Sequence, residues 1–248
     1  MTTPTSSKHT PQPVSSKTTY LLGGVAVIVV AVIVIALYSW NRGGGSETVR
    51  NDGYGSAHDP SVSVAMDADG GIVLGKPGVA KVVDIFEDPL CPACGHLEKI
   101  FGQEIAQQVD QGKFAVRYRL VNFLDDRSKS KDYSSRAIAA NECVAQNGDG
   151  PIYAKFHTLL FTTKQPEEGG ADLDNKALVA VAKDAGAGDD VAKCITSGDR
   201  GETARNHADG AMKALTAASG DRVGTPSVFI DGKKIDTTDQ NWVADAAK

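Results

Sequence analysis

This 248-residue sequence has no run of basic residues. Its 26 lysines and arginines are scattered and are outnumbered by 31 acidic residues, which gives a net charge of -5. That balance argues against nucleic-acid binding. No internal repeat occurs, and no pair of histidines has the spacing of zinc ligands. Only four cysteines are present, and an even number fits two disulfides without deciding the compartment.

Charge is also missing from residues 21–37, which are flanked by Tyr20, Tyr38 and Trp40. An apolar run bounded by aromatic residues is typical of a transmembrane helix. We therefore predict a membrane anchor over residues 20–40. No Ala-x-Ala cleavage site follows the run closely, which favours an uncleaved signal-anchor over a cleaved signal peptide.

The segments on either side of this run indicate how the anchor would be oriented. Basic residues on both sides leave the positive-inside rule undecided. Residues 1–19 are short and polar, whereas the part after the anchor is large. We predict a disordered cytoplasmic tail at 1–19, a glycine-rich flexible linker at 41–60 and an exported domain at 61–248. A single span would hold that domain at the cell membrane.

Alternating apolar residues predict strands in this domain, and apolar residues at helical spacing predict helices. Strands are expected at 62–65, 72–74, 81–86, 114–124, 224–230 and 233–235. Helices are expected after Cys91 and at 133–146, 151–161, 173–185, 189–195, 203–218 and 241–247. Because strands return after a long helical block, we predict one sheet that is interrupted by an insertion at about 128–198.

Cys91 and Cys94 are separated by two residues, where an apolar strand leads into a helix. Pro92 suits the first turn of that helix. Two cysteines placed in this way can form and break a disulfide with little backbone movement, which is typical of a redox centre. A static disulfide or half of a zinc site is the alternative. Haem attachment is excluded, because Gly95 separates Cys94 from His96.

With these elements the sequence resembles the thioredoxin superfamily, and specifically the DsbA-like thiol-disulfide oxidoreductases of the membrane-anchored actinobacterial type. The resemblance covers about residues 60–248. Its basis is the strand that leads into Cys91-Pro92-Ala93-Cys94, the later Gly-Thr-Pro sequence at 224–226, and the helical insertion between them. It implies an α/β thioredoxin fold with a helical insertion between the central strand and a C-terminal β-hairpin, preceded by one transmembrane helix.

The resemblance also implies roles for particular residues. The Thr225-Pro226 peptide bond is expected to be cis and to face the dithiol motif, so that Pro226 belongs to the catalytic site. In the family an acid at about this point of the strand lies beneath the motif and takes protons as Cys94 is attacked, and Asp84 is expected to be that acid here. The alternative for Asp84 is a strand side chain that faces outward. Ala93 stands where the best-known family members carry histidine, which leaves the strength of oxidation open.

Cys91 is predicted to be the reactive thiol of the pair. Unpaired N–H groups and the dipole at a helix N-terminus stabilise a thiolate there and lower its pKa. Glu87 and Asp88 are expected in a solvated loop at the rim of the site. His96 is expected on an exposed face of the helix.

The other two cysteines, Cys143 and Cys194, both fall in the helical block. In an exported domain we expect them to form a structural disulfide that closes a long loop. Two free buried thiols are the alternative.

Together these features predict a protein thiol-disulfide oxidoreductase that introduces disulfides into exported proteins through Cys91 and Cys94. An extracytoplasmic reductase or isomerase is the first alternative, and a non-catalytic, chaperone-like binding domain is the second. No cofactor and no metal are expected. The resemblance implies two kinds of partner: unfolded exported proteins with cysteines, and a membrane quinone-linked reoxidant of the DsbB or vitamin K epoxide reductase type.

Overall fold

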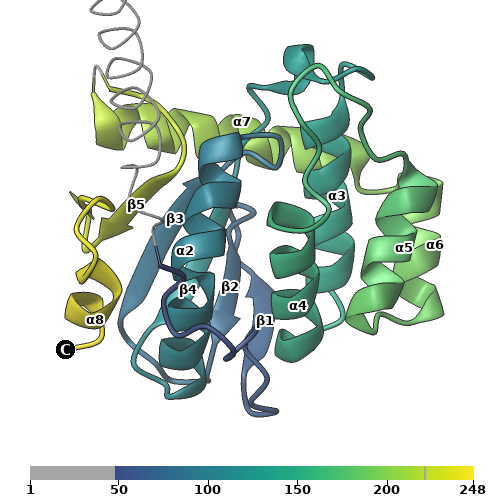
Figure 1. Ribbon diagram of the computed structural model, residues 1–248. Coiled ribbons are helices and arrows are strands. Elements are labelled where there is room, and N and C mark those ends of the chain that lie inside the picture. The colour runs from purple at the N-terminus through teal and green to yellow at the C-terminus, as the bar shows by residue number, and fades with distance from the viewer. Residues whose placement is uncertain (1–47, 221) are drawn as a thin grey trace, which may run out of the picture. The chain divides into compact units, whose positions relative to one another are not determined.

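The computed structural model describes residues 48–220 and 222–248 (Figure 1). Its centre is a six-stranded sheet in the order β1-β2-β4-β3-β5-β6. Strands β3 and β4 run parallel, and the other neighbouring strands are antiparallel. The elements are β1 (Ser63–Met66), β2 (Ile72–Gly75), β3 (Val82–Glu87), α2 (Pro92–Asp110), β4 (Ala115–Leu120), η1 (Asp125–Arg127), α3 (Tyr133–Ala145), α4 (Gly150–Phe161), α5 (Asn175–Ala185), α6 (Asp189–Ser197), α7 (Gly201–Ser219), β5 (Ser227–Ile230), β6 (Lys233–Lys234) and α8 (Trp242–Ala246).

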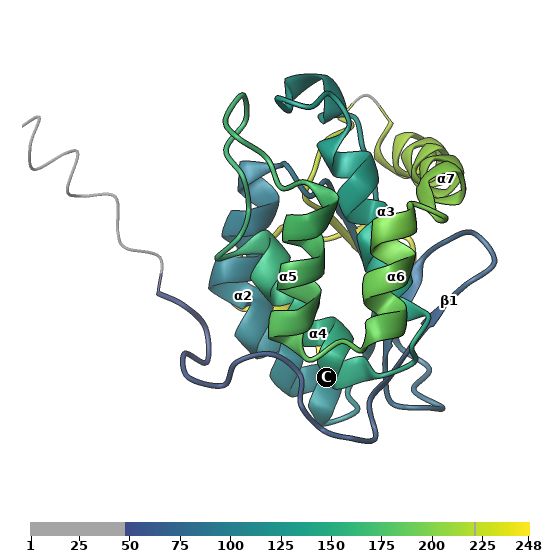
Figure 2. The same cartoon turned by 90° about the vertical axis from the view of Figure 1, so that its right-hand side faces the viewer.

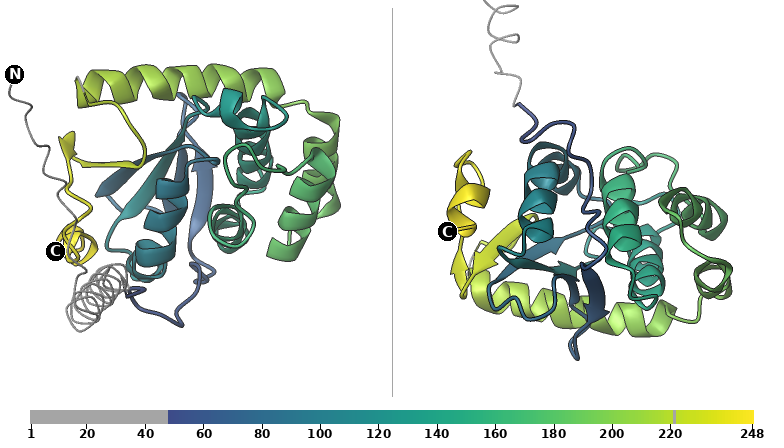
Figure 3. Two further views of the ribbon diagram at one scale, coloured as in Figure 1. Left: turned by 45° about the horizontal axis from the view of Figure 1, so that its top comes forward. Right: turned by 90° about the horizontal axis from the view of Figure 1, so that it is seen from below.

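Helices cover both faces of the sheet. Figure 3 shows α2 on one face and α7 running across the other. On the α7 face, Leu215 packs against Phe86 of β3 and Phe229 of β5. Side chains alternate along a strand, so the buried residues Val83 and Ile85 point to the face opposite Phe86. The odd-numbered residues of β3 therefore face α2, and the even-numbered ones face α7.

The helical insertion packs beside the sheet as the four helices α3, α4, α5 and α6 (Figure 2). Its core is continuous with that of the sheet, because Tyr153, Phe156 and Leu160 of α4 are fully buried in the same apolar cluster as β3 and α2. The prediction of an α/β fold with a helical insertion is confirmed.

Residues 48–60, which the sequence assigns to a flexible linker, instead pack along α2. The Arg50 side chain pairs with Glu104, and the Tyr54 hydroxyl donates a hydrogen bond to Asp110. Ala57 is buried in the core. The glycine-rich, polar composition hid these contacts, because their partners lie about fifty residues further along the chain.

The strand predicted at 114–124 is shorter in the structure, since β4 ends at Leu120. The next residues leave the sheet, and the N–H of Leu124 donates a hydrogen bond to Asp88 at 3.0 Å. The predicted tail at 1–19 and anchor at 20–40 lie outside the described residues. Within residues 48–220 and 222–248, no helix is both long enough and apolar enough to cross a bilayer.

Candidate active site

The two cysteines of the motif are free thiols at the start of α2. Cys91 is the N-cap residue and Pro92 follows in the first turn, where a missing N–H costs nothing. The N–H of Cys94 donates to the carbonyl oxygen of Cys91 at 3.0 Å. Cys91 is 7% exposed and Cys94 is fully buried, whereas Pro92 and Ala93 are exposed. An incoming sulfur atom can therefore reach Cys91 but not Cys94.

The environments of the two thiols move their pKa values in opposite directions. A hydrogen bond from Cys94, with further ones from the N–H groups of Cys94 and Ala93, lowers the pKa of Cys91 to about 6. Burial raises the pKa of Cys94 well above its ordinary value, and the hydrogen bond to Cys91 and the charge of Glu87 add to that effect. At neutral pH the pair is thus a thiolate at Cys91 beside a thiol at Cys94.

A second segment reaches the motif from the far end of the chain. The Thr225-Pro226 peptide bond is cis, and the Sγ atom of Cys91 lies 3.5 Å from the carbonyl oxygen of Thr225. The position is fixed by sheet pairing, because Ser227 of β5 is the register partner of Phe86 in β3. The sheet thereby brings Cys91, Thr225 and Pro226 together.

The insertion also braces the motif, through Gln165 in the loop after α4. Its Nε2 atom donates to the carbonyl oxygens of Cys91 at 2.9 Å and Pro89 at 3.2 Å. Gly95 makes room for this contact, since a Cβ atom at that position would lie 2.1 Å from Oε1 of Gln165. Gln165 was missed in the sequence because a lone glutamine in a polar loop carries no signal.

Asp84 does not occupy the place that the resemblance implied. It shares the β3 face of Phe86, opposite Val83 and Ile85, and its carboxylate accepts hydrogen bonds from Arg117 at 2.6 Å and Arg119 at 2.9 Å. Burial opposes ionisation, but the two guanidinium groups outweigh it and lower the pKa of Asp84. The alternative expectation, a strand side chain that faces away from the motif, describes it better.

The acid on the same face of β3 as Val83 and Ile85 is Glu87, three residues after Asp84. Glu87 and Asp88 are both fully buried, so the expected solvated rim is wrong. Asp88 accepts hydrogen bonds from the N–H groups of Leu90 and Leu124 and from the Ser134 hydroxyl. Burial raises its pKa to about 6. Asp88 thus ties the loop before the motif to the end of β4 and to α3.

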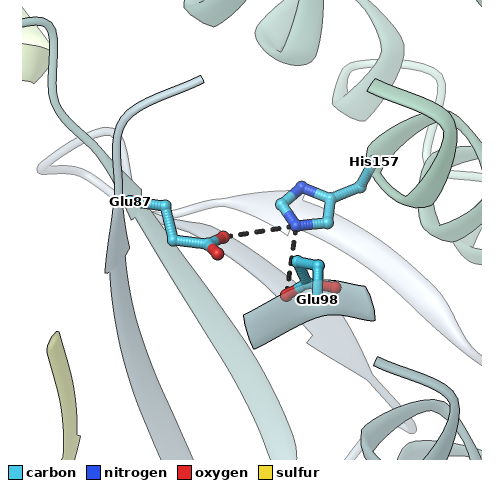
Figure 4. Close-up of side chains that lie close together, drawn as sticks. All are labelled: Glu87, Glu98 and His157. Atoms are coloured by element: carbon cyan, nitrogen blue, oxygen red, sulfur yellow. Dashed lines mark ion pairs between the residues drawn. The ribbon is translucent and has the colours of Figure 1, made fainter. Parts of the chain in front are cut away.

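Glu87, Glu98 and His157 form a buried group, which we call the acid–histidine cluster (Figure 4). The cluster lies close to the motif, because the charge of Glu87 acts on Cys94. The Nε2 atom of His157 lies 3.3 Å from Oε2 of Glu87 and 3.6 Å from Oε1 of Glu98. Burial disfavours the imidazolium, yet the two carboxylates prevail and raise the pKa of His157 to about 9. Burial, and then the charge of Glu98, raise the pKa of Glu87.

These three side chains also have the composition of a metal site, and their potential ligand atoms lie within 4.8 Å of one another. One observation favours a charged histidine, and a second argues against a metal. The His157 ring lies between Tyr118 and Phe161, with centroids 3.9 and 4.4 Å away, and aromatic faces stabilise a cation. Nδ1 of His157 has no hydrogen-bond partner, whereas a metal-bound histidine nearly always donates its other N–H.

The remaining predicted residues lie away from the motif or on its surface. Cys143 of α3 and Cys194 of α6 are joined by a disulfide with an S–S distance of 2.01 Å. It ties two helices of the insertion together. His96 is exposed on α2, as expected.

A dithiol at the N-terminus of a helix, beside a cis-proline loop and on this sheet, defines a thioredoxin-fold dithiol protein. The family model described as Thioredoxin matches residues 67–244. The chain belongs to this family.

Solved structures of similar proteins identify the group within the thioredoxin family that this chain resembles. The MdbA protein, a thiol-disulfide oxidoreductase from Corynebacterium diphtheriae, is 33% identical with a TM-score of 0.66, and the match covers 77% of this chain and 95% of that one. Oxidised DsbA from Mycobacterium tuberculosis is 32% identical with a TM-score of 0.55, covering 75% and 97%. The described residues therefore have the fold of DsbA-like thiol-disulfide oxidoreductases.

One curated relative is a much longer protein. The serine/threonine-protein kinase PknE of Mycobacterium tuberculosis is 37% identical over 176 residues, which is 70% of this chain. The match spans only 31% of the kinase's length.

Proposed function

We propose that this protein is a protein thiol-disulfide oxidoreductase that introduces disulfides into exported proteins through Cys91 and Cys94. The observation that carries the proposal is the contrast between the two thiols. The pKa of Cys91 is about 6, while that of Cys94 lies well above its ordinary value. A low thiol pKa stabilises the reduced form, so the corresponding disulfide is a better oxidant.

The reaction would begin when a substrate thiolate attacks Sγ of Cys91 in the Cys91–Cys94 disulfide. The bond between the two cysteines breaks, its electron pair goes to Cys94, and a mixed disulfide forms. A second substrate thiolate then displaces Cys91 and takes the disulfide away. Glu87, and not Asp84, is the acid on the α2 face that would exchange a proton with Cys94.

Unfolded polypeptides are the proposed substrates. Phe123 and Val223 are large apolar side chains that remain 45% and 39% exposed. Phe123 precedes Leu124, which is held by Asp88, and Val223 lies just before the Thr225-Pro226 loop. Exposed apolar side chains of this kind suit contact with apolar segments of an unfolded chain.

Oxidation of a peptide with two cysteines tests the proposal. The oxidised wild-type protein should convert the peptide to its disulfide, and Cys91→Ala should not. When the peptide is supplied in its disulfide form instead, the Cys91 thiolate of Cys94→Ala should open that disulfide, form a mixed disulfide with one peptide sulfur and leave the other as a thiolate, and the variant should fail to release the peptide. Undiminished peptide oxidation by Cys91→Ala would rule the mechanism out, and refolding of a substrate by a variant without both cysteines would favour the chaperone-like alternative.

The direction of electron flow is a separate part of the proposal. Titration of the Cys91–Cys94 pair with glutathione measures its reduction potential. A potential well above that of thioredoxin, about -270 mV, is expected of an oxidase. A potential close to it would favour a reductase, for which Ala93 in place of histidine is the supporting observation.

We further propose that the domain is exposed outside the cytoplasm at the cell membrane and is reoxidised by a quinone-linked membrane partner of the DsbB or vitamin K epoxide reductase type. The Cys143–Cys194 disulfide supports the compartment, because structural disulfides persist in oxidising surroundings. Protease treatment of intact protoplasts should degrade the domain. Protection from the protease would contradict this location.

A further inference from the structure

The acid–histidine cluster reaches a second surface of the molecule, where α2 and the end of α4 meet the 48–60 segment. A cavity of 370 Å³ is lined there by Glu98, Gly102, Gln103, Thr158 and residues of the 48–60 segment. Oε1 of Glu98 faces His157. Oε2 lies toward Gly102, where a Cβ atom would come within 3.0 Å of it. One carboxylate therefore bridges the buried cluster and the cavity.

The other sides of the cluster are closed. The rings of Tyr118, Tyr153 and Phe161 surround His157, and all three residues are buried. Cys94 is fully buried, and the charge of Glu87 acts on its thiol. The proton that Cys94 gains or loses is therefore not exchanged by direct contact with solvent.

We propose that His157 and Glu98 form a proton path that connects Cys94 and Glu87 with water in this cavity. The path rests on the proposed function, because it serves the step in which Cys94 gains or loses its proton. His157 and Glu98 touch neither substrate nor sulfur in this scheme. They act through Glu87.

In the oxidising direction, attack on Cys91 breaks the disulfide, and the electron pair left on Cys94 takes a proton from the carboxylic acid of Glu87. The Glu87 carboxylate then accepts the Nε2 proton of the His157 imidazolium. Neutral His157 is protonated again, at the same nitrogen, by Glu98, which takes its proton from cavity water. When Cys94 attacks a mixed disulfide, the same transfers run in reverse.

The geometry suits these transfers, since a single nitrogen atom lies near both carboxylates, at 3.3 and 3.6 Å. Both distances exceed that of a charge-assisted hydrogen bond, and proton-transfer contacts often shorten only during reaction. The three atoms of the route, Oε2 of Glu87, Nε2 of His157 and Oε1 of Glu98, are buried and make no hydrogen bond to any group outside the cluster. A transfer among them would therefore break no other hydrogen bond.

Other titratable groups face the cluster from the elements packed around it. They are Cys91 at the N-cap of α2, Cys94 from α2, Tyr118 from β4 and Tyr153 from α4. Burial raises the pKa of both tyrosines well above the ordinary value, so they stay neutral and supply no proton near pH 7. At the cavity the charged groups besides Glu98 are Asp52 and Lys99.

Simultaneous detection of sulfur exchange and proton release tests the path. The reduced protein is converted to a mixed disulfide of Cys91 with thionitrobenzoate. Attack by Cys94 then releases the coloured thiolate and one proton, which phenol red reports in weakly buffered solution in the same stopped-flow trace. The variants are His157→Gln and Glu98→Gln. Glu104→Gln is the matched control, because it removes another buried carboxylate of α2, one that pairs with Arg50.

In the wild type and in Glu104→Gln, the proton should appear with the thiolate. In His157→Gln and Glu98→Gln it should lag by about tenfold or more, and a small proton acceptor such as formate should shorten the lag. Gly102→Ala leaves all titratable groups in place but covers Oε2 of Glu98, and it should also delay the proton. Simultaneous release in these three variants would overturn the path, as would equal slowing of both signals.

The two proposals fail in different ways. If wild-type Cys94 does not release thionitrobenzoate from Cys91, the proposed oxidoreductase function is wrong. If the wild type does so but the variants show no lag, only the proton path is wrong.

Discussion

Replacing Cys94 with alanine should raise the pKa of Cys91, because Cys94 supplies the largest contribution to the low value. The pKa of Cys91 is about 6 instead of 9.0, a difference that corresponds to ~4 kcal/mol. A hydrogen bond to a charged acceptor contributes about 1.5–3 kcal/mol. Its loss should therefore weaken the ionisation of Cys91 by roughly ten- to hundredfold. The N–H groups at the start of α2 remain and keep part of the effect.

The rate of alkylation by iodoacetamide, followed by mass spectrometry from pH 4 to 10, measures this change. At pH 6 the wild-type Cys91 is about half ionised, so the rate of Cys94→Ala, relative to its own plateau at high pH, should be roughly five- to fiftyfold lower there. The plateau of the variant should be as high as that of the wild type or higher, because a thiolate of higher pKa is the stronger nucleophile. Cys94→Ser is the matched control, because its hydroxyl can still donate, and its profile should stay close to that of the wild type. Identical profiles for Cys94→Ala and the wild type would refute the reasoning and assign the low pKa to the helix terminus alone.

Replacing Cys143 and Cys194 by serine should lower the free energy of unfolding in urea by ~4 kcal/mol, since their disulfide closes a loop of 51 residues; a loss below ~1 kcal/mol would contradict the loop argument. Asp84→Asn should leave the rate of peptide oxidation unchanged, because Asp84 lies on the α7 face of β3; a large loss in that assay would return Asp84 to the site. The reduced wild type should gain ~2 kcal/mol of unfolding free energy over Cys91→Ala between pH 6 and pH 8. The folded pKa of Cys91 is lowered, so its contribution is present above the unfolded pKa and is lost as pH falls toward 6; parallel stability curves would exclude this linkage.

Much of the fold could be predicted because its signals are local. The helix expected at 151–161 is found at Gly150–Phe161, since apolar periodicity and a helix-starting proline lie within the same dozen residues. The dithiol motif was equally accessible, because its spacing and its place between a strand and a helix need no tertiary information. The ordered segment at 48–60 was not, because its contacts are with α2.

The acid near the motif and its histidine partner were harder to predict from the sequence. Asp84 drew attention because it interrupts an apolar strand, but the alternation of side chains places it on the face opposite Val83. The same alternation places Glu87 on the face of Val83 and Ile85, and so predicts Glu87 as the acid near the motif. Glu98 carried a signal too, since it falls on the apolar face of its helix with Leu97 and Phe101. The approach of His157 to both acids depends on the packing of α4 and could not be read from the chain.

Pairing of β5 with β3 joins segments from opposite ends of the domain, and this order matters when the chain is synthesised. Cys91, Cys94 and Cys143 are all made before Cys194, the bonding partner of Cys143. The Thr225-Pro226 loop that contacts Cys91 comes later still. Contacts between such distant segments form late. A growing chain therefore holds three thiols, one of them reactive, before Cys194 and the Thr225-Pro226 loop have been made. During its own synthesis the protein must avoid wrong disulfides, which is the problem that we propose it solves for other proteins.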